Sequence, residues 1–173
     1  MSFIQELKER DLFYASTDEE ALEKHLSENA PVTFYIGFDP TADSLHVGSL
    51  LQILLMVRLQ RHGHRPIAVV GGGTGMIGDP SGKSAERKLL DEASLAKNVK
   101  GIESQLSRFM DMTDPVIGAR VVNNYDWLGK MGFIEFLRDV GKHFSVNAMI
   151  AKESVENWLA VRGPGIRCIR VRD

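Results

Sequence analysis

The fold is decided by residues 32–70, which read VTFYIGFDPTADSLHVGSLLQILLMVRLQRHGHRPIAVV. Residues 32–38 are rich in β-branched and aromatic side chains, which predicts a strand, and their unbroken apolar character predicts burial on both faces. Residues 46–61 have the length of a helix and are apolar around most of its circumference, as in a buried helix. Residues 66–70 are a second apolar run. Strand, helix and strand within about forty residues form a right-handed crossover, so we expect the two strands to be parallel.

Further elements are expected on both sides of this unit. Residues 1–30 predict two helices, and a capping box of Thr17 and Glu20 opens the second. The remaining expected elements are a helix over residues 94–110, a strand over 119–122, and helices over 132–143 and 147–159. No internal repeat, low-complexity segment or clear linker interrupts this order. We therefore expect one α/β domain built on a parallel sheet.

The composition is that of an ordinary globular protein, with 43% hydrophobic and 25% charged residues among 173 and a net charge of −2. This charge excludes a broadly basic nucleic-acid binder, although it allows a local basic patch. No apolar run approaches the ~20 residues that span a bilayer, and the N-terminus shows no secretory signal. The single cysteine, Cys168, cannot form an internal disulfide, and no Cys/His spacing suggests a metal site. We expect a cytoplasmic domain without membrane contact or structural metal.

The loop after the first expected strand could bind a phosphate. In open parallel sheets, ligands bind beyond the carboxyl ends of the strands, and a helix N-terminus there offers free N–H groups and a positive dipole end. His46 could donate a hydrogen bond to a phosphate, and Gly48 would leave room for a flat base against the backbone. The alternative is that Asp43 or Ser44 caps the helix and that His46 is only solvated. These residues alone leave both interpretations open.

The loop after the second expected strand is rich in glycine, with six glycines in residues 71–82. Residues 73–78 satisfy G-x-G-x-x-G, a pattern typical of dinucleotide sites, but so many glycines make the match weak, and Asp79 and Pro80 follow it instead of an apolar helix. A nicotinamide-dependent redox enzyme is therefore a poor hypothesis. Residues 78–84 imitate a P-loop but have three residues between the glycines where four are needed, which excludes a Walker A site.

What remains in this second loop is a flexible backbone followed by charged side chains. Asp79 is expected to be a buried acid, and Lys83 and Arg87 are expected to be mobile cations. A purely structural turn has no evident need for this combination. A ligand-binding role is therefore favoured over a structural one.

Several longer segments resemble the catalytic domain of bacterial tyrosyl-tRNA synthetases, which are class I aminoacyl-tRNA synthetases. They are YIGFDPTADSLHVGSL at residues 35–50, GHRPI at 63–67, IGDPSGK at 77–83, NNYDW at 123–127 and DVGKHFSVN at 139–147. The resemblance covers residues 1–157 and implies the first half of the family's Rossmann-like nucleotide-binding fold. It divides the chain into an N-terminal helical segment, 1–30, a partial catalytic domain, 31–166, and an unrelated basic tail, 167–173.

The resemblance implies that tyrosine attacks the α-phosphate of ATP to give tyrosyl-adenylate, and that the tyrosyl group then passes to tRNA(Tyr). Residues 46–49 stand at the class I signature, in which Ser49 replaces the final histidine of the usual pattern. His46 and Thr41 would stabilise charge on the triphosphate, and Gly48 would accommodate the adenine.

The implied site can be grouped by ligand. The catalytic group is Thr41, His46, Ser49, Lys83 and Arg87; the tyrosine-binding group is Tyr35 and Asp79; and the ATP-binding group is Gly37, Asp39, His46 and Gly48. Lys83 and Arg87 would close over the pyrophosphate, and Asp79 would pair with the α-ammonium of tyrosine. Mg²⁺ would accompany ATP, and no tightly bound cofactor is expected.

The sequence lacks the second half of the family's nucleotide-binding fold, its lysine-bearing KMSKS loop and its anticodon-binding regions. We therefore expect the chain alone to be inactive in full aminoacylation. The family's subunits pair through the region that corresponds to residues 125–165, so a homodimer is expected. The alternative is a non-catalytic fragment that acts only as a dimerisation or nucleotide-binding module.

Overall fold

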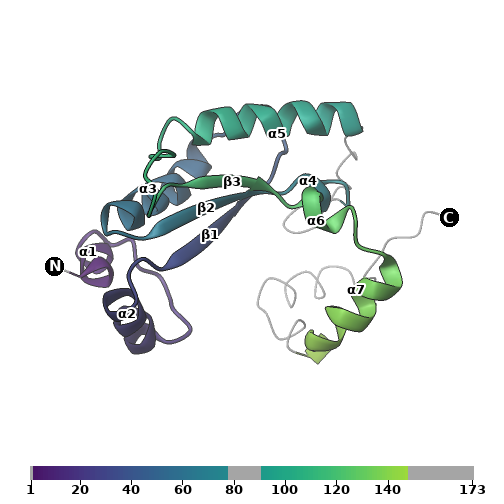
Figure 1. Cartoon of the computed structure of the whole chain (residues 1–173). Helices are drawn as coiled ribbons and strands as arrows, with labels where there is room; N and C mark the ends of the chain where they lie inside the picture. Colours follow the sequence, from purple (N-terminus) through teal and green to yellow (C-terminus); the bar gives the residue numbers. More distant parts are fainter. Residues whose placement is uncertain (1, 78–90, 148–173) are drawn as a thin grey trace, which may run out of the picture.

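The sheet of this computed structural model, which describes residues 2–77 and 91–147, is parallel throughout. Within those residues it has three strands in the order β1 (Thr33–Phe38), β2 (Arg65–Val70) and β3 (Arg120–Asn123), as Figure 1 shows. Phe38 pairs with Val70, which pairs with Asn123, so all three strands end on one line. The parallel crossover expected from the sequence is confirmed.

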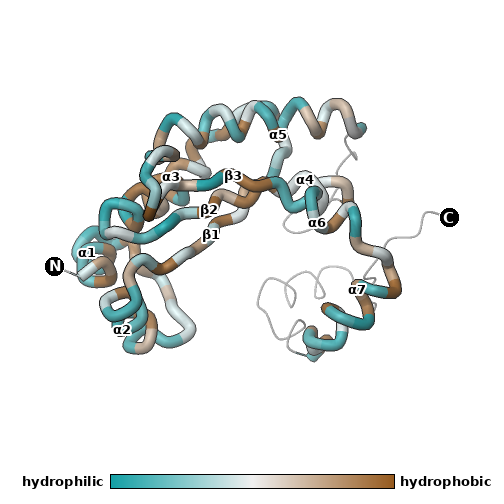
Figure 2. The backbone as a smooth tube through the Cα atoms, in the orientation of Figure 1, coloured by the Kyte–Doolittle hydropathy of each residue, from teal (hydrophilic) through white to brown (hydrophobic). Residues whose placement is uncertain are grey.

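Two long helices, α3 (Val47–Arg61) and α5 (Glu92–Leu106), supply the main core against this sheet. The strand residues that face them alternate with residues that do not, because successive side chains of a strand point to opposite faces. The buried core comprises Phe38, Ile53, Met56, Ala68, Val70, Val99, Ile102, Leu106, Met110 and Ala119. Figure 2 shows the apolar stretches of the strands beneath these helices.

The prediction that the first strand is buried on both faces is wrong for the described residues. Phe34, Ile36 and Phe38 pack toward the helices, whereas Tyr35 on the other face is 74% exposed. The reason is that both long helices cover one face of the sheet, and β1 pairs on one side only within the part described. Helix α3 is likewise buried on one side, and Leu51 on its outer side is 56% exposed.

The expected pair of N-terminal helices is present as α1 (Phe3–Glu9) and α2 (Glu19–Glu28). Helix α1 buries Phe3, Ile4 and Leu7 in a second, smaller core that includes Leu59 of α3. The capping residue of α2 differs from the prediction. Asp18, not Thr17, is the N-cap, and its carboxylate accepts a hydrogen bond from the Ala21 amide at 2.9 Å.

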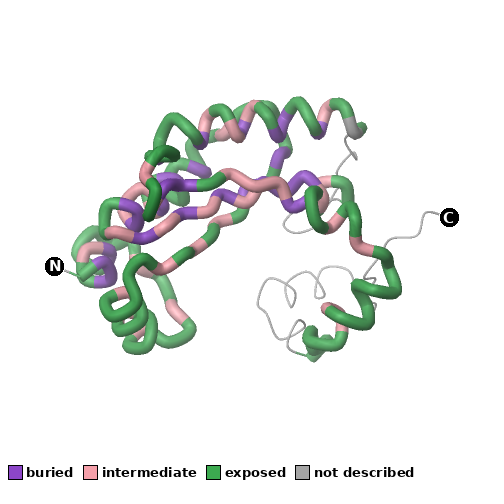
Figure 3. The backbone as a smooth tube through the Cα atoms, in the orientation of Figure 1, coloured by how far each residue is buried: buried purple, intermediate pink, exposed green. Residues whose placement is uncertain are grey.

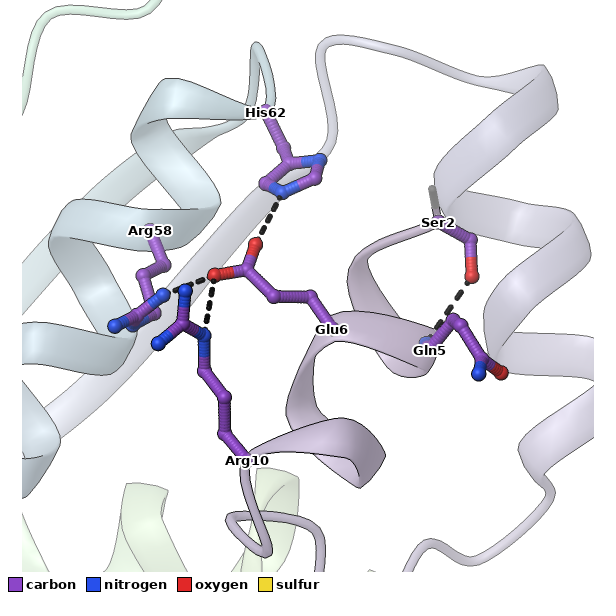
Figure 4. A network of polar contacts seen from close by, with 6 residues as sticks. All are labelled: Ser2, Gln5, Glu6, Arg10, Arg58 and His62. Carbon is purple, nitrogen blue, oxygen red and sulfur yellow. Dashed lines mark hydrogen bonds and ion pairs between the residues drawn. The ribbon is translucent and has the colours of Figure 1, made fainter.

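Charged side chains also join α1 to α3, as Figure 4 shows. Glu6 forms ion pairs with Arg58 of α3 and with Arg10, whose Nε lies 3.1 Å from Oε1. The Nε2 atom of His62 lies 2.9 Å from the other oxygen, Oε2. The hydrogen bond to His62, with the charges of Arg58 and Arg10, holds the pKa of Glu6 below its ordinary value.

The remaining elements are short, and the last two lie apart from the sheet. Helices α4 (Gly72–Gly75) and α6 (Tyr125–Leu128) are one turn each at the ends of β2 and β3. Helix α7 (Phe133–Asp139) and the 3₁₀ turn η1 (Gly141–His143) replace the single helix predicted over 132–143. Figures 1 and 3 show α7 away from the sheet with almost its whole length exposed.

The helix predicted over 147–159 and the tail at 167–173 extend beyond the residues that the structure describes. None of the helices described within residues 2–77 and 91–147 is long and apolar enough to cross a membrane.

Candidate functional site

The loops that follow the three strands meet at the carboxyl edge of the sheet. The strand pairing continues one residue past the strands, because the Gly71 amide donates to the Phe38 carbonyl at 2.9 Å and the Asn124 amide donates to the Val70 carbonyl at 3.0 Å. Residues 39–46, the turn of α4 and the start of α6 are therefore neighbours. This is the edge at which the sequence placed a ligand site.

His46 is the N-cap of helix α3. Its Nδ1 atom accepts a hydrogen bond from the Gly48 amide at 3.0 Å, and the side chain is otherwise exposed. Because Nδ1 accepts, a neutral imidazole in this geometry carries its proton on Nε2, which is free to donate. The alternative that Asp43 or Ser44 caps this helix is wrong.

The N-terminus of α3 has the properties of an anion site. Its first turn holds no acidic residue, and the helix dipole places partial positive charge there. The Gly48 amide donates to His46 Nδ1 and the Ser49 amide donates to the His46 carbonyl at 2.9 Å, which leaves the Val47 amide open to a ligand. A Cβ atom on Gly48 would lie 2.7 Å from Cε1 of His46, so a side chain here would push the imidazole away from its position over this turn. A pocket of about 490 Å³ borders His46, and its walls include Leu50, Arg108 and Phe109.

Of the other residues implied at the first loop, two are exposed and one is buried. Asp39 and Thr41 are exposed at the edge of the sheet, where the Thr41 amide donates to the Asp39 carbonyl at 2.9 Å. Ser49 is buried, with 9% of its surface exposed, in the first turn of α3. The structure therefore gathers Asp39, Thr41 and His46 in one exposed loop and turns Ser49 inward.

Tyr35 and Gly37 lie on β1, on the face of the sheet that α3 and α5 do not cover. Both are exposed, and they alternate with the core residues of the same strand. Asp79, Lys83 and Arg87 lie outside the described residues. Among the residues that are described, no group of three or more His, Cys, Asp or Glu side chains is arranged to hold a metal ion.

Asn124 is a site residue for which the sequence analysis assigned no role. It is buried, with 8% of its surface exposed, directly after β3. Its Oδ1 atom accepts from the Gly73 amide at 2.7 Å, and its Nδ2 atom donates to Thr74 Oγ1 at 3.1 Å. The asparagine therefore fixes the glycine-rich turn of α4 to the end of the third strand. Two signals pointed to it in the sequence: a polar residue close to a strand end, and the segment NNYDW at residues 123–127, which carries the family resemblance.

Comparisons with known proteins agree with this geometry. The sequence family described as tRNA synthetases class I (W and Y) matches residues 27–169. Tyrosine--tRNA ligase 2 of Enterococcus faecalis is 57% identical over 155 residues, which are 90% of this chain and 37% of that protein. A tyrosine--tRNA ligase of Aliivibrio fischeri is 53% identical over 163 residues, which are 94% of this chain and 38% of that protein.

Solved structures show the same likeness. The C-terminally truncated mitochondrial tyrosyl-tRNA synthetase of Aspergillus nidulans superposes with a TM-score of 0.81 at 26% identity, covering 96% of this chain and 49% of that one. The corresponding structure from Coccidioides posadasii gives a TM-score of 0.76 at 29% identity, covering 92% of this chain and 45% of that one. The chain thus spans well under half the length of the curated relatives that it matches.

Proposed function

The chain belongs to the class I tRNA synthetases of the tryptophan and tyrosine group, and from this we propose that it forms the first half of the nucleotide-binding site of a tyrosine–tRNA ligase. In such an enzyme the carboxylate of L-tyrosine attacks the α-phosphate of ATP, which gives tyrosyl-adenylate and releases pyrophosphate, and the tyrosyl group then passes to tRNA(Tyr) with release of AMP. The observation that carries the proposal is the N-terminus of α3, where His46 caps the helix through Nδ1 and presents a free Nε2–H beside the positive end of the helix dipole.

This arrangement suits electrostatic stabilisation of the triphosphate. Attack on the α-phosphate builds negative charge on the phosphate oxygens, and fixed donors aimed at that charge lower the barrier without transferring a proton. His46 and Thr41 are the proposed donors. Gly48, which leaves room for the imidazole over the first turn, is proposed to accommodate the adenine beside it, and Gly37 and Asp39 complete the ATP side. In this scheme Lys83 and Arg87 close over the pyrophosphate, and Mg²⁺ accompanies ATP.

Tyrosine is proposed to lie on the open face of β1. Tyr35 is exposed there, with its hydroxyl available to the substrate phenol, and Asp79 is proposed to pair with the α-ammonium group. Ser49 is buried in the first turn of α3, and we propose that this small residue allows the turn to pack closely.

We propose that this 173-residue chain does not complete aminoacylation alone. Residues 1–173 match only 37% of the length of one curated relative and 38% of another, so they supply only part of the residues that such an enzyme uses. A homodimer through residues 125–165 and a cytoplasmic location complete the proposal. The second candidate function, a non-catalytic binding or assembly module, is supported by the exposed apolar side chains of α7.

The experiment is a calorimetric titration of the chain with tyrosine, with ATP and with a non-hydrolysable tyrosyl-adenylate analogue. We expect the analogue to bind, His46→Ala to abolish binding, and His25→Ala, on the exposed surface of α2, to leave it unchanged. A folded chain that does not bind the analogue would contradict the nucleotide site and favour the assembly module. Tyrosine-dependent pyrophosphate exchange by the chain alone would contradict the proposed inactivity.

A further inference from the structure

One face of helix α5 holds the loop that carries His46. Three residues of α5 at helical spacing contact this loop, which is about sixty positions earlier in the sequence: Asn98, Gly101 and Gln105. Residues three and four apart lie on the same face of a helix, so these contacts form one row.

Asn98 holds the start of the loop. It is buried, with 8% of its surface exposed, and its Nδ2 atom donates to the Pro40 carbonyl at 3.1 Å. Pro40 is itself fully buried between Asp39 and Thr41. A buried donor requires a partner, so the loop backbone and the helix side chain fix each other.

Gly101 allows the middle of the loop to approach the helix backbone. A Cβ atom at this position would lie 2.1 Å from the carbonyl oxygen of Asp43, a distance that no side chain tolerates. Glycine is unfavourable in a helix interior, so the contact explains why α5 has glycine here. Lys97 adds an ion pair to Asp43 at 3.0 Å, which lowers the pKa of that carboxyl, but both side chains are exposed and the pair is weak.

Gln105 holds the end of the loop. Its Oε1 atom accepts from the Leu45 amide at 2.8 Å, and Leu45 packs partly buried against the main core. Leu45 immediately precedes His46, so this bond fixes the Ser44–Leu45 peptide group, one residue before the histidine. The histidine can then cap α3 through Nδ1 and present Nε2–H outward.

We propose that Asn98, Gly101 and Gln105 are positioning residues that hold residues 40–45 so that His46 caps α3 and keeps a single donor atom facing the ligand. The use of that donor rests on the proposed function, whereas the positioning of the loop does not. The two can therefore be tested separately.

The test of positioning needs no ligand. Gln105→Met removes the acceptor, Gln105→Glu keeps an acceptor oxygen, and Lys100→Ala changes an exposed α5 residue as the control. Hydrogen exchange of the Leu45 amide and the ¹⁵N signals of the His46 ring are measured by NMR, together with the thermal midpoint. We expect Gln105→Met to speed exchange at Leu45 by about tenfold or more and to mix the two ring tautomers. Gln105→Glu and Lys100→Ala should match the unmodified chain in both.

A Leu45 amide that exchanges rapidly in the unmodified chain would overturn the positioning role. So would His46 signals that Gln105→Met leaves unchanged. Gln105→Glu keeps the acceptor oxygen. If it lowers the thermal midpoint and alters the His46 signals as much as Gln105→Met does, then the hydrogen bond to Leu45 is not what positions His46, and the proposal is also overturned.

The second variant, Gly101→Ala, tests the contact at the middle of the loop. Alanine is the better helix former, but its Cβ atom would meet the backbone carbonyl of Asp43, so the loop must shift away and the thermal midpoint should fall. We expect the His46 signals to change, and the affinity for the tyrosyl-adenylate analogue to drop about tenfold, a factor equal to 1.4 kcal/mol. If the unmodified chain does not bind the analogue, the proposed function fails, and the exchange and ring signals still decide the positioning. Unchanged His46 signals in Gly101→Ala would overturn it.

Discussion

At the scale of single residues, Asn124 has the most connected position at the carboxyl edge. The side-chain amide of Asn124 accepts a hydrogen bond from the Gly73 amide and donates one to Thr74 Oγ1, and both partners belong to a turn about fifty positions earlier in the sequence. The backbone amide of Asn124 also extends the pairing of β3 with β2. The glycine-rich turn has few side chains of its own, so its conformation depends on this neighbour.

We predict that Asn124→Ala lowers the free energy of unfolding by about 1–3 kcal/mol, because the Gly73 amide loses its acceptor in a largely buried setting. Asn124→Asp keeps the acceptor and should cost less than Asn124→Ala. Urea unfolding of the variants provides the measurement, with Lys130→Ala as an exposed control. Equal stability of Asn124→Ala and the control would show that water replaces the lost contact.

The placement of the candidate residues could be predicted in part. His46 and Gly48 were expected at a helix N-terminus after a strand, and the structure has them there, because this is a local pattern. Their roles stay a proposal, for which the class I signature is the basis. Asn98 and Asn124 were not assigned roles, because their partners are 58 and about 50 positions away and no local pattern records such a bond. The capping alternatives at Asp43 and Ser44 failed because several residue types can cap a helix, and only the backbone path decides which one does.

At the scale of secondary-structure elements, the attachment of α1 to α3 is both apolar and ionic. Phe3, Ile4 and Leu7 pack on Leu59, and Glu6 lies between Arg58 and His62 at the edge of that contact. The folded-state pKa of Glu6 is lowered, first by the hydrogen bond to His62 and then by the nearby arginines. A lowered carboxyl pKa means that the fold favours the charged form.

This attachment predicts a pH dependence. The contribution of Glu6 is fully present above the ordinary pKa of an unfolded glutamate, about 4.3, and is lost as the pH falls through the lower folded-state value. We therefore expect Glu6→Gln to lower the thermal midpoint at neutral pH, and the difference from the unmodified chain to shrink in acid. Thermal unfolding from neutral to acidic pH measures this, with Glu9→Gln, near the end of the same helix, as the control. A difference that stays constant with pH would contradict the ionic role.

The elements also show which sequence signals were sufficient. The apolar runs and their spacing predicted β1, α3 and β2 to within one residue at either end, since an apolar strand or helix must bury its side chains somewhere. The same signal overestimated the burial of β1 and α3. Apolar character indicates how much surface a segment can bury, but the neighbours that cover it are set by the tertiary arrangement. Helix α7 is the clearest case, since the apolar spacing of residues 132–143 predicted a helix and the structure buries none of α7.

At the scale of the whole molecule, the described residues form a sheet covered by helices on one face and a separate helix, α7, with exposed apolar side chains. Tyr35 marks the open face, and Figures 1 and 3 show α7 exposed away from the sheet. On α7 and the turn after it, Phe133 is 65%, Ile134 is 71% and Phe144 is 61% exposed. Exposed apolar side chains grouped in this way are typical of a surface that associates with another protein.

This surface predicts that the chain associates with itself as its concentration rises. We expect the sedimentation coefficient of the unmodified chain to increase between a low and a high protein concentration. Ile134→Glu should weaken this association about 10- to 100-fold. The variant places a charge in the contact and loses the free energy of burying the isoleucine side chain, about 1–3 kcal/mol. Glu135→Gln, next to it on α7, is the control and should associate like the unmodified chain. If Ile134→Glu associates as strongly as Glu135→Gln, the contact lies elsewhere. The open face of β1 is then the next surface to test, because Tyr35 is exposed there on a strand that pairs on one side only within the described residues.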